Sequence, residues 1–257
     1  MNIVQYEVRD RIGFITLNRP EKRNALNEEL IRSLSITFDQ AAKDNAVKLI
    51  ILKANGEAFC SGADLGYLQQ LQGFSFDDNF ADSTRLKELF QKIYTLNKVV
   101  IAQVEGHAIA GGCGLATVCD FIFSVPEAKF GYTEVKIGFI PAIVMVFLIR
   151  KIGDQRARQL LLSGNLVGAA EASELGLITR VISKDTIANE ALDFAGKLIK
   201  SNSSQAMMST KRMIAEVQSL PLEEALTYAA RMNADARGTE DCKKGIAGFL
   251  NKQAPEW

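Results

Sequence analysis

The sequence has few of the residues that build metal centres or disulfide frameworks. It contains one histidine, His107, and four cysteines that form no Cys-x-x-Cys pair. Structural zinc sites need several Cys or His ligands at close spacing. We therefore expect neither a metal site nor a disulfide framework, and we interpret His107 as a packed or hydrogen-bonded residue rather than a catalytic base.

An excess of charge of either sign is also missing. Thirty Lys and Arg residues balance thirty Asp and Glu residues, which gives a formal net charge of zero. No long-range field then attracts nucleic-acid phosphates or an anionic membrane, and no basic patch interleaved with aromatic residues is visible. We expect no nucleic-acid partner and no membrane partner, so an anionic ligand must be held by local contacts.

Long hydrophobic runs are absent as well. The most apolar stretch, residues 137–149, contains Gly138 and Pro141 and is well short of the roughly 20 residues of a membrane span. We predict that it is a buried helix. The first residues alternate apolar and polar side chains, unlike a signal peptide, so a cytoplasmic location is expected.

The residues that are present predict an α/β fold. With 257 residues, 47% of them hydrophobic and 23% charged, the chain suits one large globular domain or one domain with an appendage. Alternation predicts a hairpin of strands 3–8 and 12–17. Periodicity then predicts helix 28–43, strand 47–52, helix 85–96 and strand 99–104. Fully apolar strands with helices between them are typical of α/β proteins.

Helical patterns replace strands from about residue 184 onward. The predicted helices are 187–199, 204–217, 222–237 and 239–250, and no Gly/Ser linker separates them from the rest. We interpret this region as a helical appendage that packs on the core or on a neighbouring subunit.

An internal repeat is the most informative local signal. Residues 56–65 (GEAFCSGADL) align without gaps with residues 106–115 (GHAIAGGCGL), fifty positions later. Each copy follows an apolar strand, so each is interpreted as a strand, a glycine-bearing turn and a helix start with unpaired backbone N–H groups. Two such turns, brought together, can direct two N–H donors at one oxygen atom.

Several motifs then resemble the crotonase superfamily of enoyl-CoA hydratases and isomerases, over essentially the whole chain. They are residues 18–27 (NRPEKRNALN), 58–65 (AFCSGADL), 104–116 (VEGHAIAGGCGLA), 119–123 (CDFIF), 129–138 (KFGYTEVKIG) and 248–257 (GFLNKQAPEW). The resemblance implies a spiral of ββα units with a C-terminal helical region. It also implies an acyl-CoA thioester ligand, no separate cofactor, and a homotrimer or a hexamer made of two trimers. On this basis we divide the chain into a core with the acyl-CoA site, residues 1–195, and a helical oligomerisation region, residues 196–257.

The same resemblance implies the site residues. The thioester oxygen accepts hydrogen bonds from the backbone N–H groups of Ala63 and Gly111. The repeat alone does not select these two donors, because it aligns Ala63 with Cys113 and Gly111 with Ser61. Residues expected to contact CoA or the acyl group are Lys22, Arg23, Ala25, Ser61, Asp64, Leu65, Gly112, Gly114, Phe249 and Lys252. The alternative for Lys22 and Arg23 is a solvated charged loop, and for Asp64 an ordinary acid at a helix start. For Phe249 and Lys252 it is the pattern of an amphipathic helix.

The catalytic acids depart from the usual family pattern. Family hydratases commonly carry two glutamates, but here the first position is Gly114 and only Glu134 remains. Glu134 lies between a Gly-Tyr-Thr turn and an apolar segment, where burial raises a carboxyl pKa. We expect Glu134 to be catalytic; an exposed glutamate at a helix start is the alternative. One carboxylate suits a hydration, a Δ3,Δ2-enoyl-CoA isomerisation or a decarboxylation.

A finer resemblance concerns residues 112–116, residues 133–143 and the last residues of the chain. They are similar to the bacterial methylglutaconyl-CoA hydratases of leucine breakdown, which also carry Gly in place of the first Glu. This implies hydration of a short branched enoyl-CoA with a distal carboxylate, 3-methylglutaconyl-CoA being the leading candidate. We expect Gly114 to leave space for that carboxylate, with Arg85, Lys87 or Lys92 as its partner. We expect residues 69–82 to form a variable pocket loop, whereas an isomerase would use the apolar run 143–147.

Overall fold

Two β-sheets organise the protein, whose computed structural model describes residues 2–257. The larger sheet has the strand order β1 (Val4–Arg9), β2 (Ile12–Leu17), β3 (Leu49–Ala54), β5 (Val99–Val104), β7 (Phe121–Ser124) and β10 (Arg180–Val181). The first two strands form the predicted antiparallel hairpin, and the other pairs in this sheet are parallel. The smaller sheet has the order β4 (Ala58–Cys60), β6 (His107–Ile109), β8 (Lys129–Gly131) and β9 (Val167–Gly168).

The internal repeat corresponds to two successive ββα units. In each copy a strand of the large sheet leads through a turn to a short strand of the small sheet and then to a helix. The first unit is β3, β4 and α2 (Leu65–Leu71), and the second is β5, β6 and α4 (Gly111–Thr117). Strands β4 and β6 pair in parallel, so the two copies lie side by side, as the α/β interpretation requires.

The strongly periodic elements match their predictions closely. Helix α1 (Glu28–Lys43) begins at its Asn27 N-cap, whose side chain accepts a hydrogen bond from Leu30 N–H at 2.9 Å. It buries one apolar face on the sheet. Strand β5 has the predicted bounds, whereas β3 begins two residues after the predicted start because the Val47 N–H closes a turn onto Asp44 O. The His107 Nδ1 accepts a hydrogen bond from Lys129 N–H at 3.2 Å, which agrees with its interpretation as a hydrogen-bonded residue.

The prediction of a variable loop at residues 69–82 is wrong. Helix α2 covers its first part, and α3 (Phe76–Tyr94) begins nine residues before the predicted helix. Side-chain caps start both helices: Asp64 accepts from Gly66 and Tyr67 N–H, and Ser75 accepts from Asp78 N–H. Such caps supply partners for N–H groups that a helix start leaves free, so this polar stretch folds without an apolar periodicity.

The prediction of a single buried helix at residues 137–149 is also wrong. The chain forms a short 3₁₀ turn, η2 (Glu134–Ile137), and then α5 (Ala142–Ile152). Gly138, with φ of 73°, and Pro141 separate them. Ile137, Phe139 and Ile140 are exposed, and Val144 and Leu148 are the members of this run that are buried.

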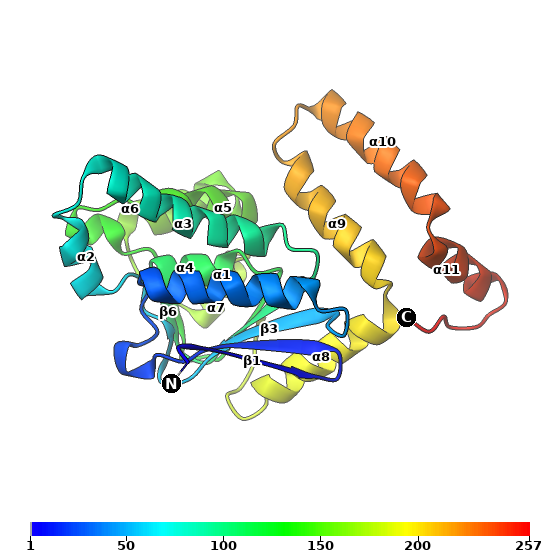
Figure 1. Ribbon diagram of the computed structural model, residues 1–257, viewed down its shortest axis with the longest axis horizontal. Helices are drawn as coiled ribbons and strands as arrows, with labels where there is room; N and C mark the ends of the chain where they lie inside the picture. Colours follow the sequence, from blue (N-terminus) through cyan, green and yellow to red (C-terminus); the bar gives the residue numbers. More distant parts are fainter. Residues whose placement is uncertain (1) are drawn as a thin grey trace.

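The remaining helices divide between the body and an arm. Helices α6 (Asp154–Ser163) and α7 (Ala169–Glu174) complete the body, and α8 (Ile187–Ser201) buries Ile187, Ala191, Ala195 and Ile199. Helices α9 (Ser204–Val217), α10 (Leu222–Gly238) and α11 (Glu240–Leu250) form the arm, which stands beside the body (Figure 1). None of the helices within residues 2–257 combines the length and apolarity needed to cross a membrane.

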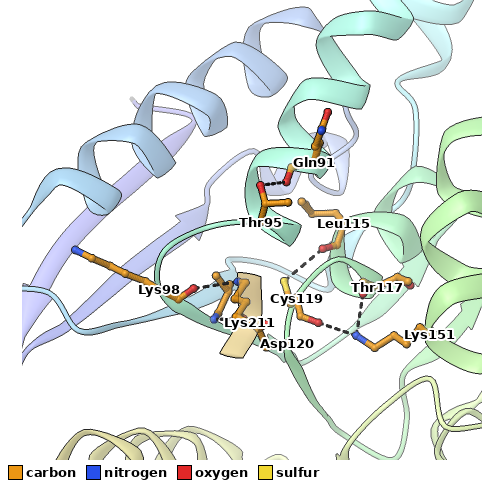
Figure 2. A network of polar contacts seen from close by, with 10 residues as sticks. Gln91, Thr95, Lys98, Leu115, Thr117, Cys119, Asp120, Lys151 and Lys211 are labelled. Carbon is orange, nitrogen blue, oxygen red and sulfur yellow. Dashed lines mark hydrogen bonds and ion pairs between the residues drawn. The ribbon is translucent and has the colours of Figure 1, made fainter. Parts of the chain in front are cut away.

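A buried lysine connects the arm to the body. Lys211 on α9 is only 6% exposed. Its ammonium group donates to Asp120 Oδ2 at 2.7 Å and to Lys98 O at 3.0 Å (Figure 2). Asp120 in turn accepts from Val100 N–H on β5. The first arm helix is therefore anchored at the N-terminal end of the central strand β5.

Candidate active site

The first turn of the candidate site is held in place by the buried side chain of Asn24. Its amide donates to Asn55 O and Ala58 O, both at 2.9 Å, and its Oδ1 accepts from Arg19 N–H at 2.8 Å. These bonds clamp the loop after β2 onto the turn between β3 and β4. The loop therefore passes directly beside the residues that follow β4.

The backbone N–H of Ala63 is free within the described residues. Leu26 N–H donates to Gly62 O at 2.7 Å, and Asp64 N–H donates to Leu26 O at 2.8 Å, which makes an isolated parallel bridge between Leu26 and Ala63. In a parallel bridge the middle residue directs its own N–H away from the partner strand. No acceptor within residues 2–257 bonds the Ala63 N–H, so this donor is available to a ligand.

The second turn leads into α4. Ala110 donates its N–H to Gly131 O at 2.7 Å and has φ of 50° and ψ of −124°, an unusual backbone conformation for a non-glycine residue. Gly111 follows as the first residue of α4, which has no side-chain N-cap. The Gly111 N–H is thus among the donors that a helix start leaves without an intrahelical partner.

The far end of α4 is fixed by Lys151. Its buried ammonium group donates to Thr117 O at 2.8 Å and to Cys119 O at 2.6 Å (Figure 2). Burial lowers the pKa of Lys151. A cation at the C-terminal carbonyls of a helix is favourable, so α4 is anchored although three of its first four residues are glycine.

The two turns touch each other. A Cβ atom at Gly62 would lie 2.9 Å from the Ala110 Cβ and 3.6 Å from the Gly111 nitrogen, and Gly62 has φ of +93°. A Cβ atom at Gly112 would lie 2.2 Å from Cys60 O. Glycine is required at both positions because any side chain would separate the turns. The N–H groups of Ala63 and Gly111 therefore belong to adjoining turns, a geometry suited to stabilising an oxyanion.

Glu134 lies at the start of η2, three residues after β8. The residue is half-buried, and its Oε2 atom is buried with no hydrogen-bond partner among residues 2–257. Burial raises the pKa of Glu134 above its ordinary value, against a smaller opposing effect of its own backbone N–H. Burial raises the pKa of Cys113 on α4 and of Tyr132, and the charge of Glu134 adds a smaller effect in the same direction. Glu134 is thus a half-buried residue with one carboxyl oxygen shielded from solvent, not an exposed helix-start acid.

The expectation that Gly114 leaves space for a substrate carboxylate is wrong. A Cβ atom at Gly114 would lie 2.2 Å from Val144 Cγ1 and 3.0 Å from Phe90 Cε2. Side chains of α5 and α3 already fill the volume that a longer residue would need. The missing glutamate has been replaced by packed apolar groups rather than by a cavity.

Several residues expected to bind CoA line the loop beside the first turn. Lys22 and Arg23 are exposed, and the Arg23 carbonyl accepts a hydrogen bond from Ser61 N–H at 3.1 Å. Ala25 is buried, and its carbonyl accepts from the Arg19 guanidinium. The loop therefore brings two exposed cationic side chains, which form no ion pair within residues 2–257, close to the turn that carries Ala63.

Asp64 is occupied by structural contacts. It caps α2 and forms an ion pair of 2.7 Å with Arg19, in which both side chains are about 15% exposed. Burial alone would raise the pKa of Asp64, but the contacts with Arg19, Tyr67 N–H and Gly66 N–H outweigh this and hold it below its ordinary value. The helix-start alternative thus describes its contacts. Leu65, next in the chain, is 78% exposed.

Phe249 and Lys252 are not brought to this site within one chain. Both are exposed, and Phe249 is 85% exposed at the end of α11. Helix α11 lies at the opposite end of the molecule from α2 (Figure 1). A contact with CoA bound near Ala63 would have to come from an adjacent subunit.

The cations considered for a distal substrate carboxylate are already paired or exposed. Arg85 lies 3.2 Å from Asp82, and Lys92 lies 2.6 Å from Asp39. Lys87 is exposed. None of the three is a free cation facing a pocket within the described residues.

Sequence reasoning missed two features of the site. The positive φ of Ala110 carries no signal in the sequence, because alanine is not the residue expected there. The fully buried Tyr132, whose hydroxyl lies 2.8 Å from Thr117 Oγ1, was present in the quoted motif only as a neighbour of Glu134. An aromatic residue two positions before a buried acid was the one available clue.

The comparisons with known proteins agree with this geometry. The chain matches the sequence profile described as Enoyl-CoA hydratase/isomerase over residues 7–257. A Thermus thermophilus protein named as an enoyl-CoA hydratase is 38% identical over 255 residues, covering 99% of this chain and all of that protein. The 2,3-dehydroadipyl-CoA hydratase of Escherichia coli is 32% identical, covering 96% of this chain and 95% of its own length.

A solved structure gives the same result for the fold. The crystal structure of an enoyl-CoA hydratase from Mycobacterium smegmatis superposes with a TM-score of 0.93 at 28% identity, and covers 100% of this chain and 99% of that one. The match extends through the ββα units and the arm. With two adjoining backbone N–H donors beside a buried carboxyl group, and relatives alike over their whole length, the chain belongs to the enoyl-CoA hydratase/isomerase family of enzymes.

Proposed function

We propose that the protein adds water across the double bond of a short enoyl-CoA thioester, with Glu134 as its single acid-base group. The observation that carries the proposal is the buried, unpartnered Oε2 of Glu134 beside the helix that presents the Gly111 N–H. A buried carboxyl group with a raised pKa exchanges protons more readily near neutral pH than an exposed one.

The reaction needs one proton taken and one returned. Glu134 removes a proton from water, and the hydroxide oxygen bonds to C3 of the enoyl group. The C2–C3 π electrons then move toward the thioester, whose oxygen gains negative charge and is held by the N–H groups of Ala63 and Gly111. Protonated Glu134 returns the proton to C2, which completes the addition of one water molecule.

The CoA portion has candidate contacts on the same side as Ala63. Lys22 and Arg23 supply positive charge for its phosphates, and Ser61 and Leu65 flank the path of the pantetheine. Ala25, Gly112 and Gly114 contribute close backbone approach or packing. Phe249 and Lys252 would reach CoA from a neighbouring subunit of a homotrimer or a hexamer. No cofactor is needed, because the backbone donors carry the charge stabilisation.

For the acyl group we propose a short branched enoyl-CoA with a distal carboxylate, with 3-methylglutaconyl-CoA as the leading candidate. Support comes from the motifs around Gly114 and Glu134, and from the E. coli relative, whose name denotes the thioester of a dicarboxylic acid. Because Val144 and Phe90 fill the space at Gly114, the distal carboxylate must be recognised elsewhere in the pocket.

The second candidate is a Δ3,Δ2-enoyl-CoA isomerase. The apolar groups that replace the second acid favour it, because they leave no second polar side chain at Gly114 to orient water. In that reaction Glu134 would carry a proton between C2 and C4.

A steady-state panel separates the candidates. Purified enzyme is assayed for hydration of 3-methylglutaconyl-CoA and crotonyl-CoA, for migration of the double bond of a 3-enoyl-CoA, and for decarboxylation of a carboxyacyl-CoA. The proposal requires the highest kcat/KM for 3-methylglutaconyl-CoA. A higher kcat/KM for crotonyl-CoA would refute the proposed preference for a substrate with a distal carboxylate. A higher value for the 3-enoyl-CoA would identify an isomerase.

A further inference from the structure

The hydroxyl of Tyr132 connects the segment that carries Glu134 to helix α4. Tyr132 is fully buried between β8 and η2. Its Oη atom lies 2.8 Å from Thr117 Oγ1, and Thr117 Oγ1 also lies 2.8 Å from Cys113 O. These contacts join two elements that are otherwise separate in the chain.

The direction of these hydrogen bonds follows from a count of protons. The Cys113 carbonyl is an acceptor only, so the Thr117 hydroxyl donates its single proton there. The Tyr132 hydroxyl must then donate to Thr117 Oγ1. Each hydroxyl in this buried series of hydrogen bonds has a defined donor and acceptor, so removing one hydroxyl leaves a neighbouring polar group without its partner.

The Glu134 segment is thereby attached to α4 at both ends of the helix. At the N-terminal end, Gly131 O accepts from Ala110 N–H, immediately before the Gly111 donor. At the C-terminal end, Tyr132 reaches Thr117, the last residue of α4. Two attachment points prevent rotation of one element against the other, which a single backbone bond would allow.

We propose that Tyr132 is a positioning residue, whose hydrogen bond to Thr117 holds the Glu134 carboxyl group in register with the oxyanion-binding N–H of Gly111. This inference rests on the proposed role of Glu134. A displacement of about 1 Å at a reacting group can cost about 10²-fold in rate. Loss of the Tyr132 hydroxyl is therefore expected to act on turnover more than on binding of the thioester.

The first test is Tyr132→Phe, which removes the hydroxyl and leaves the ring that fills the core. We expect kcat to fall at least about tenfold, with KM changed less than about threefold, because misplacement affects the chemical step. The matched control is Tyr94→Phe. Tyr94 also loses a hydrogen bond, from Gln218 at 3.2 Å, and its ring packs on Phe147. Its kcat should equal that of the parent enzyme.

The second test uses two variants of Thr117, one that keeps the hydroxyl group and one that removes it. Thr117→Ser retains the acceptor and should keep kcat, whereas Thr117→Val preserves the shape and should lower kcat as Tyr132→Phe does. The double variant that combines Tyr132→Phe with Thr117→Val should be no slower than the worse single variant, because both changes break one connection. Additive losses would indicate separate effects and would overturn the coupling.

Two outcomes distinguish this inference from the proposed function. If Glu134→Gln abolishes turnover but Tyr132→Phe changes only the melting temperature, the positioning role is wrong and the function stands. If Glu134→Gln keeps turnover, the role of Glu134 is wrong and the positioning role falls with it.

Discussion

The Val144 side chain fills the space that a side chain at Gly114 would need: a Cβ atom at Gly114 would lie 2.2 Å from the Val144 Cγ1. A second catalytic glutamate at this position is therefore excluded by packing and not only by its absence from the sequence. Restoring the acid would require a smaller residue on α5 as well. The absence of a second carboxylate from the site thus depends on residues of both α4 and α5.

This contact predicts the effect of Gly114→Ala. Overpacking a buried site typically costs about 1 to 3 kcal/mol, so the variant should unfold at a lower urea concentration than the parent. The double variant that also carries Val144→Ala should recover most of the loss, because the clashing methyl group is removed. Equal destabilisation of the single and double variants would contradict the contact.

The proposed base predicts that Glu134→Gln lowers kcat by at least about 10²-fold, because the amide keeps the shape of the side chain but cannot exchange a proton. Binding of CoA thioesters should be retained, since the backbone donors are unchanged. Glu57→Gln, at an exposed turn, is a suitable control and should keep full activity. Turnover near that of the parent in Glu134→Gln would refute the assignment.

The raised pKa of Glu134 also predicts a pH-dependent stability difference. Because the folded-state pKa lies above that of the unfolded chain, the folded protein binds more protons between the two values and loses stability as the pH rises through that interval. Glu134→Gln avoids this loss. Its melting temperature should exceed that of the parent at neutral pH, and the two should converge below about pH 4, near the pKa of glutamate in an unfolded chain. A constant difference across this range would count against a buried, ionising Glu134.

Much of the fold could be predicted because burial follows a regular period. Helix α1 and strand β5 have their predicted bounds, and α9 does as well. The misses share a physical cause. Helices α2 and α3 begin at the polar caps Asp64 and Ser75, where local hydrogen bonds replace hydrophobic periodicity. Gly138 and Pro141 divide the apolar run 137–149. Its hydrophobicity predicted one buried helix, which the backbone cannot form.

The candidate site was predicted less completely. The family resemblance predicted roles for Ala63, Gly111 and Glu134. The structure brings the turns of Ala63 and Gly111 together and partly buries Glu134, while the roles themselves stay predictions. They contained no information on what fills the space left at Gly114, because that depends on Val144 and Phe90, which come from other helices. Tertiary packing of this kind has no local signature in the sequence.

The arm predicts self-association. Its helices expose the large apolar side chains Leu222, Leu226, Ile246, Phe249 and Leu250, each more than half exposed. Such a concentration of apolar surface is typical of an interface. Equilibrium sedimentation at micromolar concentration should give a trimer or a hexamer, and Leu226→Glu should shift the distribution toward smaller species. A monomer for the parent protein would contradict this expectation.

The conformation of Ala110 gives the last prediction, for Ala110→Gly. An L-residue at φ of 50° and ψ of −124° stores strain of about 1 to 3 kcal/mol, which glycine relieves. The substitution adds chain entropy to the unfolded state worth about 0.4 to 1 kcal/mol, and it loses part of one methyl group, at most about 0.8 kcal/mol. Because the strain relief is comparable to or larger than these costs, the net change lies between about −1 and +3 kcal/mol, and the free energy of unfolding should be about unchanged or higher. At the same time glycine at position 110 makes the backbone before the Gly111 N–H more flexible, so this donor is held less firmly. We therefore expect kcat to fall while KM changes little. Urea unfolding and steady-state kinetics on one preparation measure both quantities, and a loss of stability above about 1 kcal/mol would show that Ala110 is not strained.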